Sequence, residues 1–216
     1  MRITIKDNTF QLFAQKAAYW VEQETLVIGD LHIGKVFHFR KAGIAVPAQA
    51  IQNNFDRLNE LMELSAPQRV IFIGDLFHSD INKEWELFCD WRKKYKETDM
   101  QIVLGNHDLL PNDFCEQFNI TVHQNPITIY PFTFSHHPFK NFSHENEYVI
   151  SGHIHPTIQL IGKANQRLKL PCFLFGAQQA LFPSFGYFTG GHAIKPMEND
   201  KIIAVVNNEL IWLPNP

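Results

Sequence analysis

Strand-length apolar segments that end in polar residues constrain this chain more than any other feature of its sequence. Five of them run directly into a cluster of Asp, Asn or His residues, and they cover residues 25–28, 70–73, 101–104, 133–135 and 148–150. Near-continuous apolar character is typical of strands that are buried on both faces, in a sheet covered by helices. Sites in layered α/β proteins form where strands end, so the clusters predict one shared site.

Two helix candidates separate the first three segments, at residues 47–64 and 81–95. Pro47 suits the first turn of the first helix. Apolar residues recur at helical spacing in both candidates and form one face of each. These residues are Ile51, Phe55, Leu58 and Met62 in the first helix, and Trp85 and Phe88 in the second. The alternation of strand and helix indicates an α/β layered fold.

The last third of the chain follows a different pattern. Strand candidates at 202–206 and 209–213 flank Asn207 and Asn208, a pair that is typical of a tight hairpin turn. A sandwich of two sheets with helices outside would accommodate both halves of the chain. No linker-like or low-complexity stretch divides the sequence, so we expect a single domain over residues 1–216.

Composition excludes several classes of protein. A membrane span needs a run of about 18 apolar residues, and neither such a run nor a signal peptide is visible, so we expect a cytoplasmic protein without a membrane partner. The net charge of -3 is not the basic excess of a protein that wraps duplex DNA. Three cysteines without CxxC spacing argue against disulfides or a thiolate zinc site. The unusual number is eleven histidines.

The five clusters carry residue types that bind divalent cations. GDLH at 29–32 and GDLFH at 74–78 each place an Asp after a strand, and two parallel strands would deliver both carboxylates to one edge. GNHD at 105–108 adds an amide oxygen. In the pair at 136–137 one imidazole can face the site, and in GHIH at 152–155 two can. Each cluster alone fits a polar turn, but five together need a compensating cation.

Taken in order, the motifs DxH, GDxxH, GNHD, H and GHxH resemble the calcineurin-like metallophosphoesterase superfamily over residues 29–155. The sequences GDLHIGK, GDLFHS, GNHD, SHHP and GHIHP are most similar to its bacterial branch of ligase-associated DNA-damage-response phosphoesterases and endonucleases. The resemblance implies an α/β fold of the metallophosphoesterase type, a four-layer α/β/β/α sandwich, with a dinuclear metal site.

Seven residues match the metal ligands of the superfamily. The resemblance implies that Asp75 bridges both metals. The other ligands would be Asp30, His32 and His155 for the first metal, and Asn106, His136 and His153 for the second.

Four further positions complete the comparison of motifs. His107 matches the general acid or transition-state contact, and Asp108 its orienting partner. His78 stands where many members have Asp, so its role is open between support of a ligand, substrate contact and a surface position. His136 is preferred over His137 by its position in the motif.

Such a site suits phosphoester hydrolysis. Two cations about 3.5–4 Å apart lower the pKa of a bridging water, and the metal-bridging hydroxide attacks phosphorus in line. A donor set of oxygen and nitrogen without thiolate fits Fe, Zn or Co, and Mn best because half of the set is rich in oxygen. We therefore expect a metal-dependent phosphoesterase, a hydrolase that cleaves phosphodiester bonds in nucleic acid or nucleotides.

Substrate choice rests with segments outside the motifs. Lys35, His38, Arg40 and Lys41 are candidates for phosphate contacts, and a solvated helix face explains them equally well. The Phe-rich segments 139–142 and 182–187 belong either to the core or to a surface that stacks on a base.

The resemblance implies a nuclease in DNA repair that acts on single-stranded or damaged DNA, with a functional link to a DNA ligase or helicase. Two alternatives remain among enzymes, a phosphomonoesterase and a cyclic-nucleotide phosphodiesterase. A binding scaffold on the same fold is the non-enzyme alternative. Occupation of all seven ligand positions by metal-binding residue types argues against the scaffold.

Overall fold

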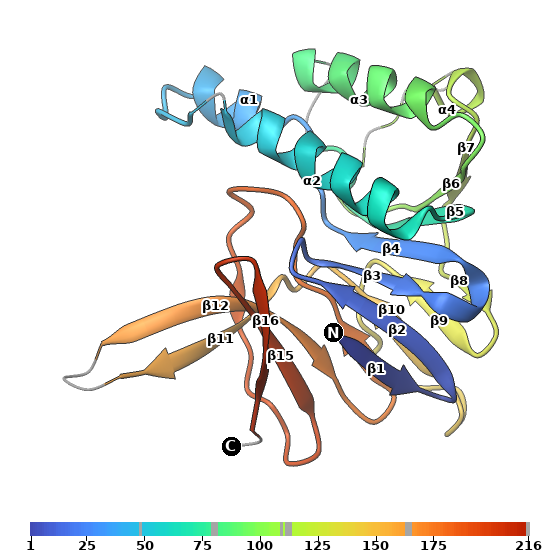
Figure 1. Ribbon diagram of the computed structural model, residues 1–216, viewed down its shortest axis with the longest axis vertical. Helices are drawn as coiled ribbons and strands as arrows, with labels where there is room; N and C mark the ends of the chain where they lie inside the picture. The colour runs from blue at the N-terminus through green and yellow to red at the C-terminus, as the bar shows by residue number, and fades with distance from the viewer. Residues whose placement is uncertain (48, 79–81, 109, 111–113, 163–165, 215–216) are drawn as a thin grey trace.

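The structure, a computed structural model, describes residues 1–47, 49–78, 82–108, 110, 114–162 and 166–214. Two β-sheets pack against each other, and helices cover the outer face of the first sheet (Figure 1). The expected α/β sandwich is confirmed. No helix of the described ranges is long and apolar enough to span a membrane.

The first sheet contains seven strands in chain order. They are β1 (Arg2–Ile5), β2 (Asn8–Phe13), β3 (Ala17–Trp20), β4 (Thr25–Gly29), β5 (Arg69–Ile73), β6 (Asp99–Val103) and β7 (Ile120–His123), with the short 3-10 helix η1 (Val21–Gln23) before β4. Strands β1 to β4 pair antiparallel, and β4 to β7 pair parallel. The predicted strands β4, β5 and β6 therefore lie side by side, with their carboxyl ends at one edge.

Four helices lie on one face of this sheet, namely α1 (Lys35–Lys41), α2 (Gln49–Ser65), α3 (Lys83–Lys94) and α4 (Phe114–Gln117). The predicted apolar faces of α2 and α3 are confirmed, since Phe55, Leu58, Trp85 and Phe88 are buried in the core below them. The start of α3 is fixed by Asn82, whose side chain accepts a hydrogen bond from Glu84 N. The predicted start at Ile81 lies outside the described residues.

Side chains of the central strands alternate between two cores. On β4, Leu26 and Ile28 pack against the helices, while Val27 faces the second sheet. On β5, Phe72 packs against the helices, while Ile71 faces the second sheet. Strands buried on both faces follow from this arrangement, and they explain the near-continuous apolar sequences.

The second sheet has nine strands. They are β8 (Ile127–Ile129), β9 (Phe132–Ser135), β10 (Tyr148–Ser151), β11 (Pro156–Ile161), β12 (Arg167–Phe175), β13 (Gln179–Leu181), β14 (His192–Ala193), β15 (Lys201–Val206) and β16 (Glu209–Leu213). The predicted hairpin is confirmed, because β15 and β16 pair antiparallel around Asn207 and Asn208, which both have positive φ.

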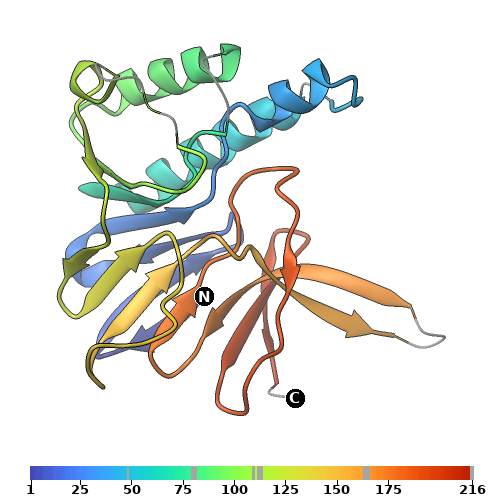
Figure 2. The same cartoon turned by 180° about the vertical axis from the view of Figure 1, so that it is seen from behind.

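The helices are distributed unevenly over the two outer faces of this sandwich. No described residue after Gln117 forms a helix, so the helical cover lies on one side of the molecule (Figures 1 and 2). The outer face of β12 and β15 carries only a small apolar cluster, which Ile158, Ile194 and Leu213 cover instead. A face that small does not need an amphipathic helix to bury it.

Candidate metal centre

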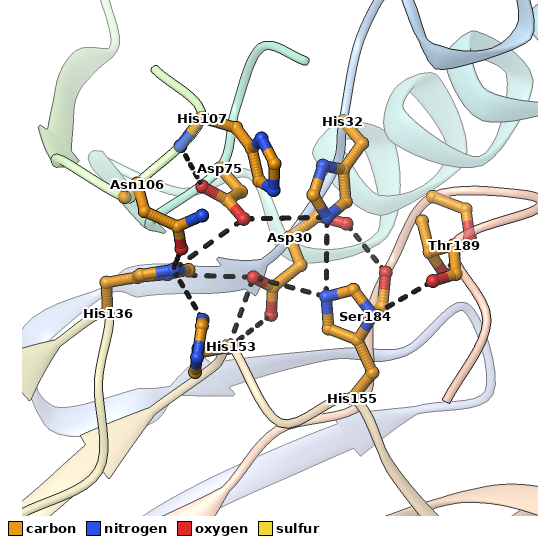
Figure 3. A network of polar contacts seen from close by, with 12 residues as sticks. Asp30, His32, Asp75, Asn106, His107, His136, His153, His155, Ser184 and Thr189 are labelled. Atoms are coloured by element: carbon orange, nitrogen blue, oxygen red, sulfur yellow. Dashed lines mark hydrogen bonds and ion pairs between the residues drawn. The ribbon is translucent and has the colours of Figure 1, made fainter. Parts of the chain in front are cut away.

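Loops from both sheets deliver the seven predicted ligands to one place. The strand ends Gly29, Ile73 and Val103 are in register across β4, β5 and β6, and Ser135 and Ser151 are in register across β9 and β10. The side chains that follow these ends face one another in Figure 3. They are Asp30, His32, Asp75 and Asn106 from the first sheet, and His136, His153 and His155 from the second.

The backbone of these loops is in a conformation that L-residues rarely adopt. The φ angles of Asp30, His32, Asp75, His153 and His155 are 49°, 52°, 43°, 64° and 48°. A left-handed conformation costs a non-glycine residue roughly 1–3 kcal/mol, and such strain concentrates at functional sites. Five of the seven predicted ligands share it, so surrounding contacts hold the loops in place.

Glycines before the motif residues allow the loops to approach closely. A Cβ at Gly105 would lie 2.2 Å from Asp75 Oδ1, and a Cβ at Gly152 would lie 2.3 Å from Asp30 Oδ2. No larger residue fits either position without displacing a carboxylate. The glycines of GNHD and GHIH are therefore part of the geometry of the site.

One set of donor atoms gathers around His155. Its Nε2 lies 3.5 Å from Asp30 Oδ1 and 3.3 Å from His32 Nε2. His32 Nε2 in turn lies 3.7 Å from Asp75 Oδ2. These residues match the predicted ligands of the first metal, and Asp30, His32 and His155 form one of the groups whose spacing suits an ion.

A second set gathers around His136. Its Nε2 lies 3.0 Å from Asn106 Oδ1, 3.1 Å from His153 Nδ1 and 3.6 Å from Asp75 Oδ2. These residues match the predicted ligands of the second metal. Asp75 Oδ2 belongs to both sets.

The hydrogen bond of His155 fixes which ring nitrogen can bind a cation. Its Nδ1 lies 3.2 Å from the carbonyl oxygen of Thr189, which can only accept, so Nδ1 carries the proton. The lone pair of Nε2 then faces Asp30 Oδ1, which is also an acceptor. Two acceptors at this separation repel each other unless a cation lies between them, and an imidazole held by a carbonyl is typical of metal sites.

Burial makes the carboxylates of the site depend on a cation. Asp30 and Asp75 are 1% and 2% exposed. Burial, together with the charge of Asp75, raises the pKa of Asp30. Burial also lowers the pKa of His136 to about 4 and lowers that of His32, so neither imidazole is positively charged at neutral pH.

The donor set fits divalent metals. Nδ1 of His32 and Nδ1 of His136 are buried and have no hydrogen-bond partner within the part of the chain that the structure describes. Nitrogen and carboxylate donors without thiolate suit Mn, Fe, Zn or Co. The residues that the structure brings together are therefore able to hold such ions.

His107 and Asp108 lie beside these donors. The ring of His107 is exposed, with its centroid 5.8 Å from that of His32, and its backbone N–H donates to Asp75 Oδ1. Asp108 accepts from Phe77 N and Gly105 N, both at 2.8 Å. Burial raises the pKa of Asp108 to about 6. The predicted pairing of Asp108 with the His107 ring is not among the hydrogen bonds found in the described ranges.

The two adjacent histidines differ in their surroundings. His136 is buried against Asp30 and Asp75, whereas His137 is exposed, and the centroid of its ring lies 4.6 Å from that of His136 and 4.2 Å from that of His153. The spacing of His136, His137 and His153 would also suit an ion. The choice of His136 over His137 as a ligand stays a prediction, and the contacts of His136 with both carboxylates support it.

Sequence reasoning missed the loop that supports the first donor set. Ser184 Oγ donates to the carbonyl oxygen of Asp30 at 2.8 Å, and Thr189 accepts from His155. The backbone N–H groups of Phe185 and Gly186 donate to Gly29 and Asp30. A lone Ser or Thr in a loop gives no signal in a sequence, so these contacts become visible only in the fold.

An α/β sandwich with buried carboxylates and a cluster of amide and imidazole donors at its strand ends is typical of a metal-dependent phosphoester hydrolase. The calcineurin-like phosphoesterase profile matches residues 24–170, and the chain belongs to this family. It is therefore a hydrolase that acts on phosphoester bonds, in a family that binds divalent metals.

The chain is also similar to solved structures. Pseudomonas putida nuclease MPE is 29% identical, with 99% of both chains covered and a TM-score of 0.82. YfcE, a phosphoesterase from E. coli, is 16% identical, with 87% of this chain and 96% of that chain covered and a TM-score of 0.48. Comparison with curated proteins gave no match.

Proposed function

We propose that this protein is a dinuclear-metal phosphodiesterase that cleaves nucleic acid or nucleotides. The observation that carries the proposal is the pair of donor sets that share Asp75 Oδ2. A shared carboxylate oxygen suits two cations held side by side. The likeness to a nuclease that is 29% identical over 99% of both chains supports a polynucleotide substrate.

Each side chain has a separate task in this proposal. Asp75 would contact both ions. Asp30, His32 and His155 would hold the first, and Asn106, His136 and His153 the second. When bound, the ions would supply an activated water as nucleophile and neutralise charge on the phosphoryl oxygens. His107 is exposed beside the cluster, where it would donate a proton to the leaving oxygen.

Manganese is the proposed metal. The donors include three oxygen-bearing side chains, Asp30, Asp75 and Asn106, next to four imidazoles. Oxygen donors favour harder ions such as Mn²⁺, and imidazole accommodates it. A role in DNA repair, linked to a ligase or helicase, is proposed from the motif sequences GDLHIGK and GDLFHS.

Metal analysis combined with model substrates tests the proposal. Protein stripped with chelator and reloaded with Mn²⁺ should hold two ions per chain, and it should hydrolyse bis-p-nitrophenyl phosphate faster than p-nitrophenyl phosphate. Mg²⁺, Zn²⁺ and Ca²⁺ in parallel would rank the metals. A faster monoester reaction would replace the proposal with a phosphomonoesterase. Absence of both binding and hydrolysis would favour the scaffold.

The polynucleotide substrate needs a separate assay. Single-stranded, nicked and intact duplex DNA of one sequence should be cleaved in the presence of Mn²⁺, with single-stranded DNA cleaved fastest, since the net charge of -3 disfavours long duplex tracking. Cleavage of cyclic mononucleotides alone would contradict this part of the proposal.

A further inference from the structure

Next to the proposed ligands lies a second group of nitrogen-bearing side chains that the two donor sets do not use. Lys35 and His38 come from α1, and His78 comes from the loop after β5. Backbone pairing brings these segments together, because Ile33 bridges to Phe77 and His78 N donates to Ile33 O at 2.9 Å. The group is therefore built into the same two loops that carry Asp30 and Asp75.

Ring contacts connect this group to the metal centre. The centroid of His78 lies 5.7 Å from that of His38 and 5.1 Å from that of His32. His107, the proposed proton donor, lies 4.7 Å from His78. A continuous row of imidazoles thus runs from α1 to the proposed ligand His32.

Lys35 adds a positive charge to this row. It lies one helical turn before His38, on the same side of α1. Burial lowers the pKa of Lys35, while the charges of Asp75 and Asp30 raise it, so the ammonium lies within electrostatic range of both carboxylates. Within the described residues it forms no ion pair, which leaves its charge available to an anion.

The position of α1 is fixed from outside the helix. Both carboxylate oxygens of the buried Glu84 on α3 accept backbone N–H groups at its start, from Gly34 at 2.9 Å and from Phe37 at 2.7 Å. The backbone that carries Lys35 and His38 is therefore fixed before any substrate arrives. Such preorganisation reduces the entropic cost of binding.

His78 has one ring nitrogen free to donate. Its Nδ1 is buried and has no hydrogen-bond partner among the described residues. A buried N–H without a partner is rarer than a buried acceptor without one, so the proton of neutral His78 belongs on Nε2. That nitrogen can then donate to an anionic oxygen.

We infer that Lys35, His38 and His78 form a phosphate subsite, which holds the phosphate next to the scissile one in a polynucleotide. This inference rests on the proposed phosphodiesterase function. One ammonium group and two imidazole donors suit the oxygens of a phosphate, and such contacts position a nucleic acid without reading its sequence. A simple aryl diester has no second phosphate, so the subsite contributes only to the binding of substrates that carry one.

A pair of dinucleotides that differ by one phosphate tests the subsite. Mn²⁺-loaded protein should cleave a thymidine dinucleotide that carries a terminal phosphate with a higher kcat/KM than the same dinucleotide without it, by about tenfold. The 5′-phosphate and 3′-phosphate isomers would show on which side the subsite lies. Bis-p-nitrophenyl phosphate reports whether the protein hydrolyses diesters at all.

The variants Lys35→Met and the double change His38→Gln with His78→Gln should bring the ratio between the two dinucleotides close to one. Lys35→Arg keeps the positive charge and should retain the preference for the dinucleotide with the terminal phosphate. This variant shows whether the effect of Lys35→Met comes from the lost charge or from misfolding. Lys93→Met makes the same charge change on an exposed part of α3 and should leave the ratio as in the wild type.

The outcomes separate the two proposals. Hydrolysis without preference for the extra phosphate, or a preference that persists in the Lys35→Met and double His variants, would overturn the subsite and leave the phosphodiesterase in place. Absence of hydrolysis of every substrate by the metal-loaded wild type would instead overturn the proposed function itself.

Discussion

At the scale of single residues, Asp75 makes contacts that no neighbour duplicates. Its Oδ2 faces His32 and His136, its Oδ1 accepts from His107 N, and its backbone oxygen accepts from His32 N. One side chain therefore links both donor sets to the GNHD loop. The loss of its charge should disturb the two sets together.

We predict that Asp75→Asn reduces diester hydrolysis by more than roughly 100-fold, beyond the usual effect of losing a supporting residue. Bound metal should fall for both ions, because a neutral amide replaces the shared carboxylate. Metal content and kcat measured on the same preparation would check this.

The matched control for that change is Asp99→Asn, which removes an exposed carboxylate that pairs with Arg69. It should behave like the wild type. Full loading with two ions in Asp75→Asn would argue against a bridging role.

The residue types in the motifs predict a ligand set, whereas the contacts that support those residues could not be predicted from the sequence. Asp30 and Asn106 belong to short patterns whose chemistry is readable within a few residues. Ser184 contacts Asp30 across 154 positions of sequence, so only the fold reveals that contact. Asp108 shows the same limit, because its carboxylate holds backbone N–H groups of two loops.

At the scale of elements, buried strands and amphipathic helices were predicted from their periodicity, and weakly patterned elements were missed. α1 has seven residues, of which Val36 is the buried one. The sequence of this helix therefore has no apolar periodicity from which it could be predicted. It depends on Glu84 of α3, a contact across about 50 positions, for its start. β1 to β3 are also short, and their antiparallel pairing becomes evident only once the sheet is assembled.

We predict that Glu84→Ala destabilises the protein by about 1–3 kcal/mol, because the N–H groups of Gly34 and Phe37 at the start of α1 lose their acceptor. Urea unfolding would measure the loss, and hydrogen exchange should show the first turn of α1 opening before α2.

The control is Glu86→Ala, on the same turn of α3 but exposed, and its effect should be much smaller. Equal destabilisation by the two changes would mean that the capping contact contributes little.

At the scale of the whole molecule, the sandwich was predictable and its asymmetry was not. One apolar core lies on each face of the first sheet, and the near-continuous apolar sequences of its central strands predict both cores. The uneven helical cover follows from the second half of the chain, whose described elements are strands connected by turns and loops.

Overall stability should depend on pH through Lys16, in the turn between β2 and β3. Burial, assisted by the charge of Arg57, lowers the pKa of Lys16 from 10.5 to about 8. Between these two values the unfolded chain binds more protons than the folded one, so this residue makes stability rise with pH. We predict that Lys16→Met is more stable than the wild type at pH 7, by up to about 3 kcal/mol.

The difference between the two proteins should disappear as the pH rises above roughly 10, because Lys16 is then neutral in both states. Urea unfolding of both proteins at pH 7 and at higher pH would measure this. A constant difference across the range would mean that Lys16 acts through packing and not through its charge.

The metal centre takes its donors from both sheets, with Asp30, Asp75 and Asn106 on one side and His136, His153 and His155 on the other. An ion held there would act as a cross-link between the two layers, in addition to the apolar core between them and the hydrogen bonds of the loop that contains Ser184. We predict that Mn²⁺ raises the thermal midpoint of the stripped protein, because binding at a hundredfold excess over Kd adds about 2.7 kcal/mol per site to the free energy of unfolding.

Asp75→Asn should show a much smaller rise, and an unchanged midpoint in the wild type would contradict the prediction. For a cell, the consequence is that metal supply would govern the lifetime of this protein as well as its activity. Without its ions the protein would unfold more readily, and proteases would degrade this inactive form first.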